Sequence, residues 1–153
     1  MNPDRLLSAL HAHPWIQGFT RQYIETLASV AEEVHFRPGQ TIFREGDASN
    51  NFYFITGGNV RLESRVDGSA VTVQVVSSGE EIGWSAMMEG GVRRFTAKAD
   101  RDVYAIALSS AKLLEACERN ASFGFVLMKH LLFVVAERLD ATRLQLIHAL
   151  HHV

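Results

Sequence analysis

The segment VRLESRVDGSAVTVQVV, residues 60–76, decides the fold class of this chain. In its first half two sets of side chains alternate, with Val60, Leu62, Ser64 and Val66 on one face and Arg61, Glu63 and Arg65 on the other. This period of two predicts a half-buried strand. Asp67-Gly68 is a two-residue hairpin signal. The pattern continues on the return strand at Val71, Val73 and Val75. The segment therefore predicts an antiparallel β-hairpin.

The chain divides into three zones, and the hairpin lies in the middle one. We expect the three zones to form one domain over residues 1–153. Residues 1–34 are expected to be a helical lead-in, in which Thr20 is a plausible N-cap. The apolar face of the helix that follows consists of Ile24, Leu27, Ala28, Val30 and Ala31. Residues 35–108 are expected to form short strands joined by glycine turns, which is typical of a small sandwich or barrel. Residues 109–153 are expected to be helical again.

The last zone contains a helix that is apolar on two sides. Ser109 or Ser110 can cap a short helix ending near Asn120, and Ser122 can open a long helix that runs to about residue 148. One stripe of the long helix consists of Phe123, Val126, Leu127, Leu131, Val134 and Leu139, and Phe125, Leu132, Phe133 and Val135 widen it. A helix with two apolar sides needs two partners. We expect the barrel to be one, and a second copy of the chain to be the other through a coiled-coil seam over residues 122–148. Burial of both sides within one chain is the alternative.

Composition excludes several classes of protein. The formal net charge of −2 argues against a basic nucleic-acid-binding face, although a local basic pocket is compatible with it. The single cysteine, Cys117, excludes an internal disulfide and a four-cysteine metal site, and we expect it to be a packing residue. The N-terminal residues lack the features of a signal peptide. The most apolar run, residues 123–136, contains Lys129 and His130 and is too short to span a bilayer, so we expect a cytoplasmic protein without membrane contact.

A second informative segment is GEEIGWSAMMEGGVRRFTA, residues 79–97. Gly79 and Gly83 stand where a phosphate-binding turn would need them, because glycine lets the backbone approach a phosphate closely. Arg93 follows Gly83 by ten residues and is followed at once by Arg94, and a guanidinium can hold a phosphate through two hydrogen bonds. A solvated pair of charges in a polar loop is the alternative for these two arginines.

These segments together resemble the cyclic-nucleotide-binding domain of the Crp/Fnr regulators. FRPGQTIFREGD, residues 36–47, resembles the opening of that domain, and residues 53–60 resemble its next pair of strands. Gly79-Glu80 and Gly83 resemble its phosphate-binding cassette, and Arg138-Leu139 with Thr142 resembles its dimer helix. The resemblance covers roughly residues 13–147. It implies an α+β, mainly β fold, in which a jelly-roll β-barrel (a double-stranded β-helix) is flanked by N-terminal helices and a long C-terminal dimerisation helix.

The resemblance also implies a ligand site in the barrel, against a short helix that follows Gly83. The ligand-binding residues that it predicts are Gly83, Trp84, Ser85, Ala86, Arg93, Arg94, Phe95, Thr96 and Thr142. Arg93 has the spacing of the phosphate-binding arginine of the family and is the first candidate for that role, with Arg94 as the second. Thr142 matches a hydroxyl that contacts the purine in Crp-like proteins; bonding within its own helix is the alternative.

Two positions depart from the family pattern. The family normally carries a glutamate directly after the cassette glycine to accept a hydrogen bond from the ribose, whereas this chain has Trp84, which donates one hydrogen bond and accepts none. Glu80 or Glu81 could supply the acceptor by a shift of register. Phe95 stands where the family usually has a small residue. Each of the two rings can bring about 150–250 Å² of apolar surface, and the sequence leaves open whether they line the pocket or fill it.

His11, His13 and His130 are candidate metal or haem ligands. His11 and His13 have His-x-His spacing, but no further ligand follows at a suitable distance, and we expect both at the surface. His130 lies on the apolar helix and is expected to be a histidine of the core or the seam. It is also the candidate iron ligand if the barrel holds haem, as in some members of this fold.

The sequence therefore predicts a stand-alone regulatory sensor and not an enzyme, since no nucleophile–base pair stands out. We expect a cyclic nucleotide (cAMP or cGMP) or another anionic small ligand, a homodimer, an unidentified protein partner, and no metal. In Crp/Fnr regulators a helix-turn-helix module follows the dimer helix, and this sequence ends at Val153, so direct DNA binding is not expected. Two other classes stay open, which are a ligand-free dimeric interaction module with an aromatic-filled pocket and a sensor of an apolar ligand or haem.

Overall fold

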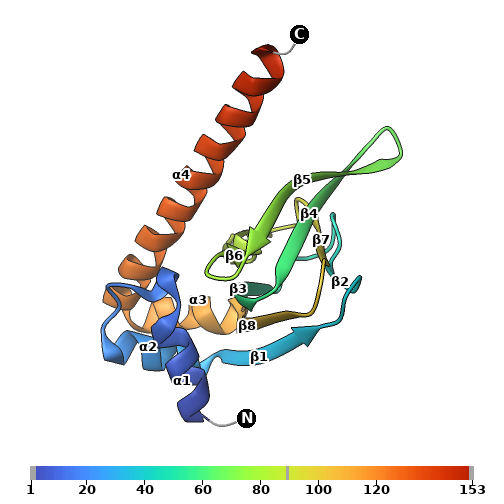
Figure 1. The fold of residues 1–153 in the computed structure, drawn as a ribbon. Coiled ribbons are helices and arrows are strands. Elements are labelled where there is room, and N and C mark those ends of the chain that lie inside the picture. Colours follow the sequence, from blue (N-terminus) through green and yellow to red (C-terminus); the bar gives the residue numbers. More distant parts are fainter. Residues whose placement is uncertain (1–2, 89, 152–153) are drawn as a thin grey trace.

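The computed structural model of the chain describes residues 3–88 and 90–151. Helices lie toward the two ends of the described chain, and all of its strands lie in one block between them, together with one short 3₁₀ turn (Figure 1). The helical segments are α1 (Pro3–Ala12), the 3₁₀ turn η1 (Pro14–Ile16), α2 (Arg21–Ser29), the 3₁₀ turn η2 (Trp84–Met87), α3 (Ser110–Arg119) and α4 (Ala121–His151). The strands are β1 (Ala31–Phe36), β2 (Thr41–Phe43), β3 (Asn51–Gly57), β4 (Asn59–Val66), β5 (Ser69–Ser77), β6 (Glu81–Ile82), β7 (Thr96–Ala99) and β8 (Val103–Ser109).

The strands form two four-stranded antiparallel sheets, with the orders β1-β8-β3-β6 and β2-β7-β4-β5. Apolar side chains from both sheets meet in one cluster between them, including Ile55, Val60, Leu62 and Val76. This arrangement confirms the predicted jelly roll. The two sheets are held together by packing and by chain crossings, because the hydrogen-bonded ladders do not continue from one sheet into the other.

Strand β3 is buried on both of its faces and joins the two halves of the core. Successive side chains of a strand point to opposite faces. Tyr53 and Ile55 therefore join the cluster between the sheets, whereas Phe52 and Phe54 pack among the helices against residues such as Phe123. Each fully buried phenylalanine contributes roughly 1.5–3 kcal/mol to the free energy of unfolding, so β3 anchors the helical layer firmly to the barrel.

The predicted hairpin is confirmed at its turn and corrected along its strands. Val66 pairs with Ser69, and Asp67 and Gly68 both have positive φ angles, 51° and 80°, which is the conformation of a type I′ turn. A bulge between Leu62 and Glu63 then shifts the register of β4 against β5. Before the bulge, Val75 pairs with Arg61 and is exposed, whereas Val76 pairs with Val60 and is buried. Beyond the bulge, Glu63 is buried and contacts Lys98 and Arg61, and Val66 and Val71 are exposed.

The helix boundaries confirm two of the predicted caps and correct two other predictions. Thr20 caps α2 and Ser109 caps α3, each by accepting a backbone hydrogen bond through its side chain. The helical lead-in ends at Ser29 and not at residue 34, because residues 31–36 pair with β8 as strand β1. The long helix starts at Ala121 and not after Ser122, since the side chain of Asn120 accepts the hydrogen bond from the backbone N–H of Phe123.

Helix α4 has 31 residues, which corresponds to a length of about 46 Å, and it extends past the strands to the far end of the molecule (Figure 1). Its first half packs on the body of the domain through Phe123, Leu127, Leu131 and Val134. Its other side is exposed along its whole length, with Phe125, Leu132, Phe133, Leu139, Leu144, Leu146, Ile147 and Leu150 all at least half exposed. Within the described residues, none of the helices combines the length and the apolar character that crossing a membrane requires.

Candidate functional site

The site is built around the turn at Gly83, which joins β6 to the 3₁₀ turn η2. Gly83 has a φ angle of 83°, in the left-handed region that favours glycine. A Cβ atom at this position would lie 2.5 Å from the guanidinium nitrogen Nη1 of Arg93 and 2.9 Å from the carbonyl oxygen of Asn51. Only glycine therefore fits between the turn and the arginine beneath it.

A cavity of about 270 Å³ lies between this turn, residues 93–95 and the face of α4 from Val135 to Thr142; we call it the cassette cavity. Its volume is just below the range of about 300–1,000 Å³ that is usual for small-ligand sites. Most of the lining is apolar. Within the described part of the chain, its charged lining residues are Arg93, Arg94 and Arg138, and no carboxylate lines it.

Arg93 is buried and is held in place by the protein. Its side chain is 4% exposed, and it donates hydrogen bonds from Nη1 to the carbonyl oxygen of Gly83 (3.3 Å) and from Nη2 to that of Asn51 (2.7 Å). Its guanidinium carbon lies 4.0 Å from the centre of the Phe43 ring, a cation–π contact. Burial lowers the pKa of Arg93. The arginine with the predicted spacing therefore ties β3 to the glycine turn, and its hydrogen-bonding fork is already engaged.

Arg94 is the arginine that the fold leaves available. It is exposed, it lines the cassette cavity, and no hydrogen bond or ion pair joins it to another described residue. Arg93 turns inward to Gly83 and Asn51, whereas Arg94 is exposed and lines the cavity. Both arginines therefore lie at the cavity, and which of them binds a phosphate stays a prediction.

Trp84 and Phe95 line the cavity without closing it. Both are half-buried, and they pack in different directions, Trp84 against the helical cluster and Phe95 against the cluster between the sheets. The volume that remains between them is the cassette cavity itself. The departure from the family pattern at these two positions therefore makes the walls of the cavity aromatic and leaves space for a ligand.

The other predicted site residues divide into two groups. Ser85 and Thr142 line the cavity, but their hydroxyl groups already have partners, which are the Ser49 hydroxyl at 2.8 Å and the Arg138 carbonyl oxygen at 2.9 Å. Ala86 and Thr96 do not line it: Ala86 is buried in η2, and the Thr96 hydroxyl accepts a hydrogen bond from the backbone N–H of Glu45.

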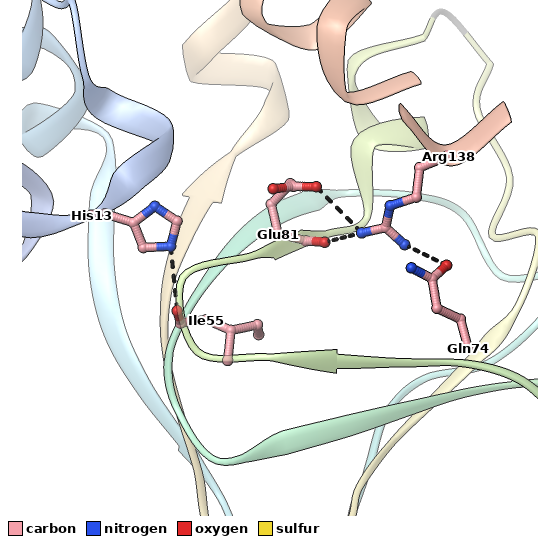
Figure 2. A network of polar contacts seen from close by, with 5 residues as sticks. All are labelled: His13, Ile55, Gln74, Glu81 and Arg138. Carbon is pink, nitrogen blue, oxygen red and sulfur yellow. Dashed lines mark hydrogen bonds and ion pairs between the residues drawn. The ribbon is translucent and has the colours of Figure 1, made fainter. Parts of the chain in front are cut away.

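Arg138 is a cavity residue to which the sequence alone gave no binding role. Its guanidinium donates to the side-chain oxygen of Gln74 (2.9 Å), to the Glu81 carboxylate (3.3 Å) and to the Glu81 backbone carbonyl, and thereby fastens α4 to β5 and β6 (Figure 2). Both charged side chains are largely buried, at 18% and 12% exposed. Burial raises the pKa of the Glu81 carboxyl, and the Arg138 charge opposes this rise. Only a fold in which α4 crosses the barrel brings these three residues together.

The histidine expectations are corrected at one position. His13 is 4% exposed and not at the surface. Its Nδ1 accepts from the backbone N–H of Trp15 (3.2 Å), so Nε2 carries the proton and donates to the carbonyl oxygen of Ile55 (3.3 Å) (Figure 2). His130 is partly buried, with its ring near those of Trp15 and Phe19 and its two nitrogens near the carbonyl oxygens of Val126 and Gln17.

Comparison with known proteins gives the same architecture. The family model for the cyclic nucleotide-binding domain matches residues 33–120, which is more than half of the chain. A protein of Geobacter metallireducens GS-15, whose given name proposes cyclic nucleotide binding, is 27% identical with a TM-score of 0.75, over 91% of this chain and 98% of that one. The catabolite activator protein of Thermus thermophilus is 25% identical with a TM-score of 0.72, over 87% of this chain and 61% of that one.

Among curated proteins, the rice potassium channel AKT1 is 24% identical over 122 residues. That match covers 80% of this chain but only 13% of the channel, so the chain corresponds to one module of that much longer protein. The matched residues 33–120 contain the Gly83 turn, both cassette arginines and seven of the eight strands in full. On these grounds the chain belongs to the cyclic nucleotide-binding domain family, and its relatives are of the Crp/Fnr type.

Proposed function

We propose that this protein is a regulatory domain that binds an anionic small ligand of the cyclic nucleotide class and signals to a partner protein through α4. The observation that carries the proposal is the charge of the cassette cavity, whose described lining contains three arginines and no carboxylate. Arg138 is paired with Glu81 outside the cavity, whereas Arg93 and Arg94 form no ion pair with a described residue, so an anion between these two like charges is favourable. The fold family supplies the class of anion, and the fold supports a regulatory, ligand-sensing role.

We assign the ligand phosphate to Arg94. Arg94 has no partner among the described residues and can form a bidentate pair with a phosphate, whereas Arg93 is buried and already uses one N–H of each terminal nitrogen for a backbone carbonyl oxygen. Gly83 contributes a turn that the ligand can approach closely. In this assignment Arg93 adds positive charge to the cavity and holds the turn in place.

The rest of the ligand would meet neutral groups. The side chains of Gln74, Ser85 and Thr142 offer hydrogen bonds, and the rings of Trp84 and Phe95 offer apolar walls. No glutamate follows Gly83, so a ribose hydroxyl would lack the charged acceptor that the family normally provides. A hydrogen bond to a charged group is worth roughly 1.5–3 kcal/mol, and we therefore expect binding to be at least about tenfold weaker than in a domain that keeps the glutamate.

We further propose that the protein is a homodimer through the exposed side of α4. Phe125, Leu132, Leu139 and Leu146 are spaced by seven residues and are all at least half exposed. Met128, Val135, Thr142 and Ala149 occupy the matching positions three residues later. A seven-residue apolar repeat of this length is typical of a two-stranded coiled coil. Three of these positions, Val135, Leu139 and Thr142, also line the cassette cavity, so ligand and seam would share one face of the helix.

The proposal is tested by calorimetric titration of the protein with cAMP, cGMP and non-cyclic AMP. We expect a cyclic nucleotide to bind, and Arg94→Ala to weaken that binding by roughly tenfold to a hundredfold, because a charge-assisted pair is lost. The matched control is Arg101→Ala, another exposed arginine, which lies in the turn before β8 and does not line the cavity.

The control variant should bind as the wild type does. Arg93→Ala separates the two arginine roles, because it should lower the stability of the fold by leaving two carbonyl oxygens without their donor. Absence of binding at millimolar concentrations of all three nucleotides would overturn the proposed ligand class. Unchanged affinity of Arg94→Ala would overturn the assignment of the phosphate to Arg94.

A further inference from the structure

Arg138 stands in the wall between two spaces. On one side it lines the cassette cavity. On the other side it lines a larger groove of about 1010 Å³ that runs along α4 and is bounded by Trp15, Phe125 and Phe133; we call it the α4 groove. Glu81 lines the groove and not the cavity. The guanidinium of Arg138 is therefore placed between an internal carboxylate on one side and the proposed ligand space on the other.

The three cavity arginines differ in what holds them. Arg93 is bound by neutral backbone carbonyl oxygens and lies over Phe43, and Arg94 has no bonding partner among the described residues. Arg138 is held by a carboxylate, together with two neutral oxygens. An anionic ligand can replace a negatively charged group that already binds an arginine. Among the three arginines this applies to Arg138, for which the ligand would compete with the Glu81 carboxylate.

We propose that Glu81 is an internal competitor of the ligand for Arg138, so that an anion in the cassette cavity draws Arg138 away from Glu81 and loosens α4 from the barrel. This inference rests on the proposed function, because it requires that an anion enters the cavity. It adds a regulatory role for two residues, Glu81 and Arg138, and gives the ligand a direct path to the movement of the helix.

The surroundings of Glu81 determine what such an exchange costs. Burial raises the pKa of its carboxyl, the Arg138 charge opposes this rise, and the neighbouring charges of Glu80 and Glu137 add to it. Breaking a buried ion pair leaves the remaining charge uncompensated, which is costly. Because the pKa of the Glu81 carboxyl is already raised, this group can take up a proton as Arg138 leaves, and the exchange then leaves no buried charge unpaired.

The same contact carries much of the polar attachment of the exposed half of α4. Among the described residues beyond Val134, the side chains of α4 that hydrogen-bond to the strands are Arg138 and Gln145, the latter with the carbonyl oxygen of Val73 (3.1 Å). Loss of the Arg138 bonds would leave this half of the helix attached to the strands by the Gln145 hydrogen bond and by its residues that line the cassette cavity. Movement of Arg138 is therefore expected to change the position of the proposed seam.

The test uses cAMP titrations of the full chain in the wild type, Glu81→Gln and Glu80→Gln. Glu81→Gln removes the competing charge and keeps an oxygen that can accept from Arg138, so its affinity for cAMP should rise by roughly two- to tenfold. Glu80→Gln changes the net charge equally, at a neighbouring carboxylate that does not bond to Arg138, and its affinity should stay unchanged. Glu81→Ala should show the same gain as Glu81→Gln, which guards against a defect specific to one variant.

Hydrogen exchange of residues 134–146 supplies the second measurement. In the wild type, saturating cAMP should speed amide exchange there, and in Glu81→Gln the increase should be smaller, because part of the attachment is already lost. If the wild type binds cAMP but its affinity equals that of Glu81→Gln, or if Glu80→Gln shows the same gain, the competition is wrong and the proposed function stands. If neither the wild type nor Glu81→Gln binds, both proposals fall together.

Discussion

Gly83 and Arg93 depend on each other as a unit within this fold. The turn is closed because the guanidinium of Arg93 lies directly beneath it and donates to its carbonyl oxygen, and any side chain at position 83 would collide with that guanidinium. A glycine in this position is usually explained by the approach of a phosphate. Here the protein itself already requires it, so the glycine alone does not establish that a ligand binds.

His13 links the lead-in to the barrel and makes the fold sensitive to acid. Burial is the largest influence on its ring and lowers its pKa, against the smaller effects of backbone carbonyl groups. Protonation would also add a hydrogen to Nδ1 of His13, which accepts a hydrogen bond from the backbone N–H of Trp15. Two N–H groups would then face each other, which is unfavourable. The unfolded chain therefore takes up this proton at a higher pH than the folded chain does.

Neutral, buried His13 should contribute fully to the free energy of unfolding above the ordinary histidine pKa of about 6.5. This contribution should be lost as the pH falls from there through the lowered pKa of His13 in the folded chain. Urea unfolding at pH 7.5 and pH 5.0 measures the loss. In His13→Gln the loss should be smaller than in the wild type, and in His11→Gln, an exposed histidine two residues earlier, it should be unchanged. An equal loss in the wild type and His13→Gln would contradict this role.

The sequence could predict which segment forms the site but not how its side chains are oriented. The spacing from Gly83 to the arginine pair is a local property, and it placed both arginines at the cavity. Which of the two faces inward depends on the bulky ring of Phe43 and the carbonyl group of Asn51, which come from distant strands. The position of Glu81 against Arg138 was equally hidden, because 57 residues separate them along the chain.

At the scale of elements, the junction between α3 and α4 rests on one side chain. Asn120 ends α3 with its backbone and caps α4 with its side chain, which accepts from the N–H of Phe123 at 3.1 Å. Replacing an asparagine cap by alanine costs about 0.5–2 kcal/mol, so Asn120→Ala should lower the free energy of unfolding by that amount. Ser122→Ala should change it by less than about 0.5 kcal/mol, because Ser122 is exposed and caps nothing. Urea unfolding of the two variants measures both costs, and a cost for Ser122→Ala that equals or exceeds that for Asn120→Ala would contradict Asn120 as the cap.

The elements that the sequence predicted correctly are those whose signals are local. The Asp67-Gly68 turn and the caps at Thr20 and Ser109 need only their immediate neighbours, and all three are confirmed. The errors arise where the local structure depends on pairing with a strand that is distant in the sequence. Pairing with β8 converts the end of the lead-in into β1, and pairing with β5 introduces the bulge that buries Glu63. Neither pairing leaves a mark in the segment itself.

At the scale of the whole molecule, the unusual feature is the amount of apolar surface along α4. Scattered exposed apolar residues are ordinary, but a stripe that follows a seven-residue repeat from Phe125 to Ala149, over about 36 Å of helix, is typical of an interface. The stripe continues past the strands, where none of the described residues covers it (Figure 1). A second copy of α4 has the same length and the same repeat, and it is the partner that matches both.

The dimer is tested most directly at Leu132, which is 70% exposed at the seam and far from the cassette arginines in the chain. A glutamate there would place two carboxylates against each other across an apolar seam, so Leu132→Glu should convert a dimer into a monomer in light scattering. Val71→Glu, at an exposed valine of the β4–β5 hairpin, adds the same charge outside the seam and should remain dimeric. Neither side chain is buried in the single chain, so both variants should still fold, and Leu132→Glu should lose only the thermal stability that dimerisation adds. A wild-type protein that scatters as a monomer at high concentration would contradict the seam, and α4 would then have to be covered by a different protein.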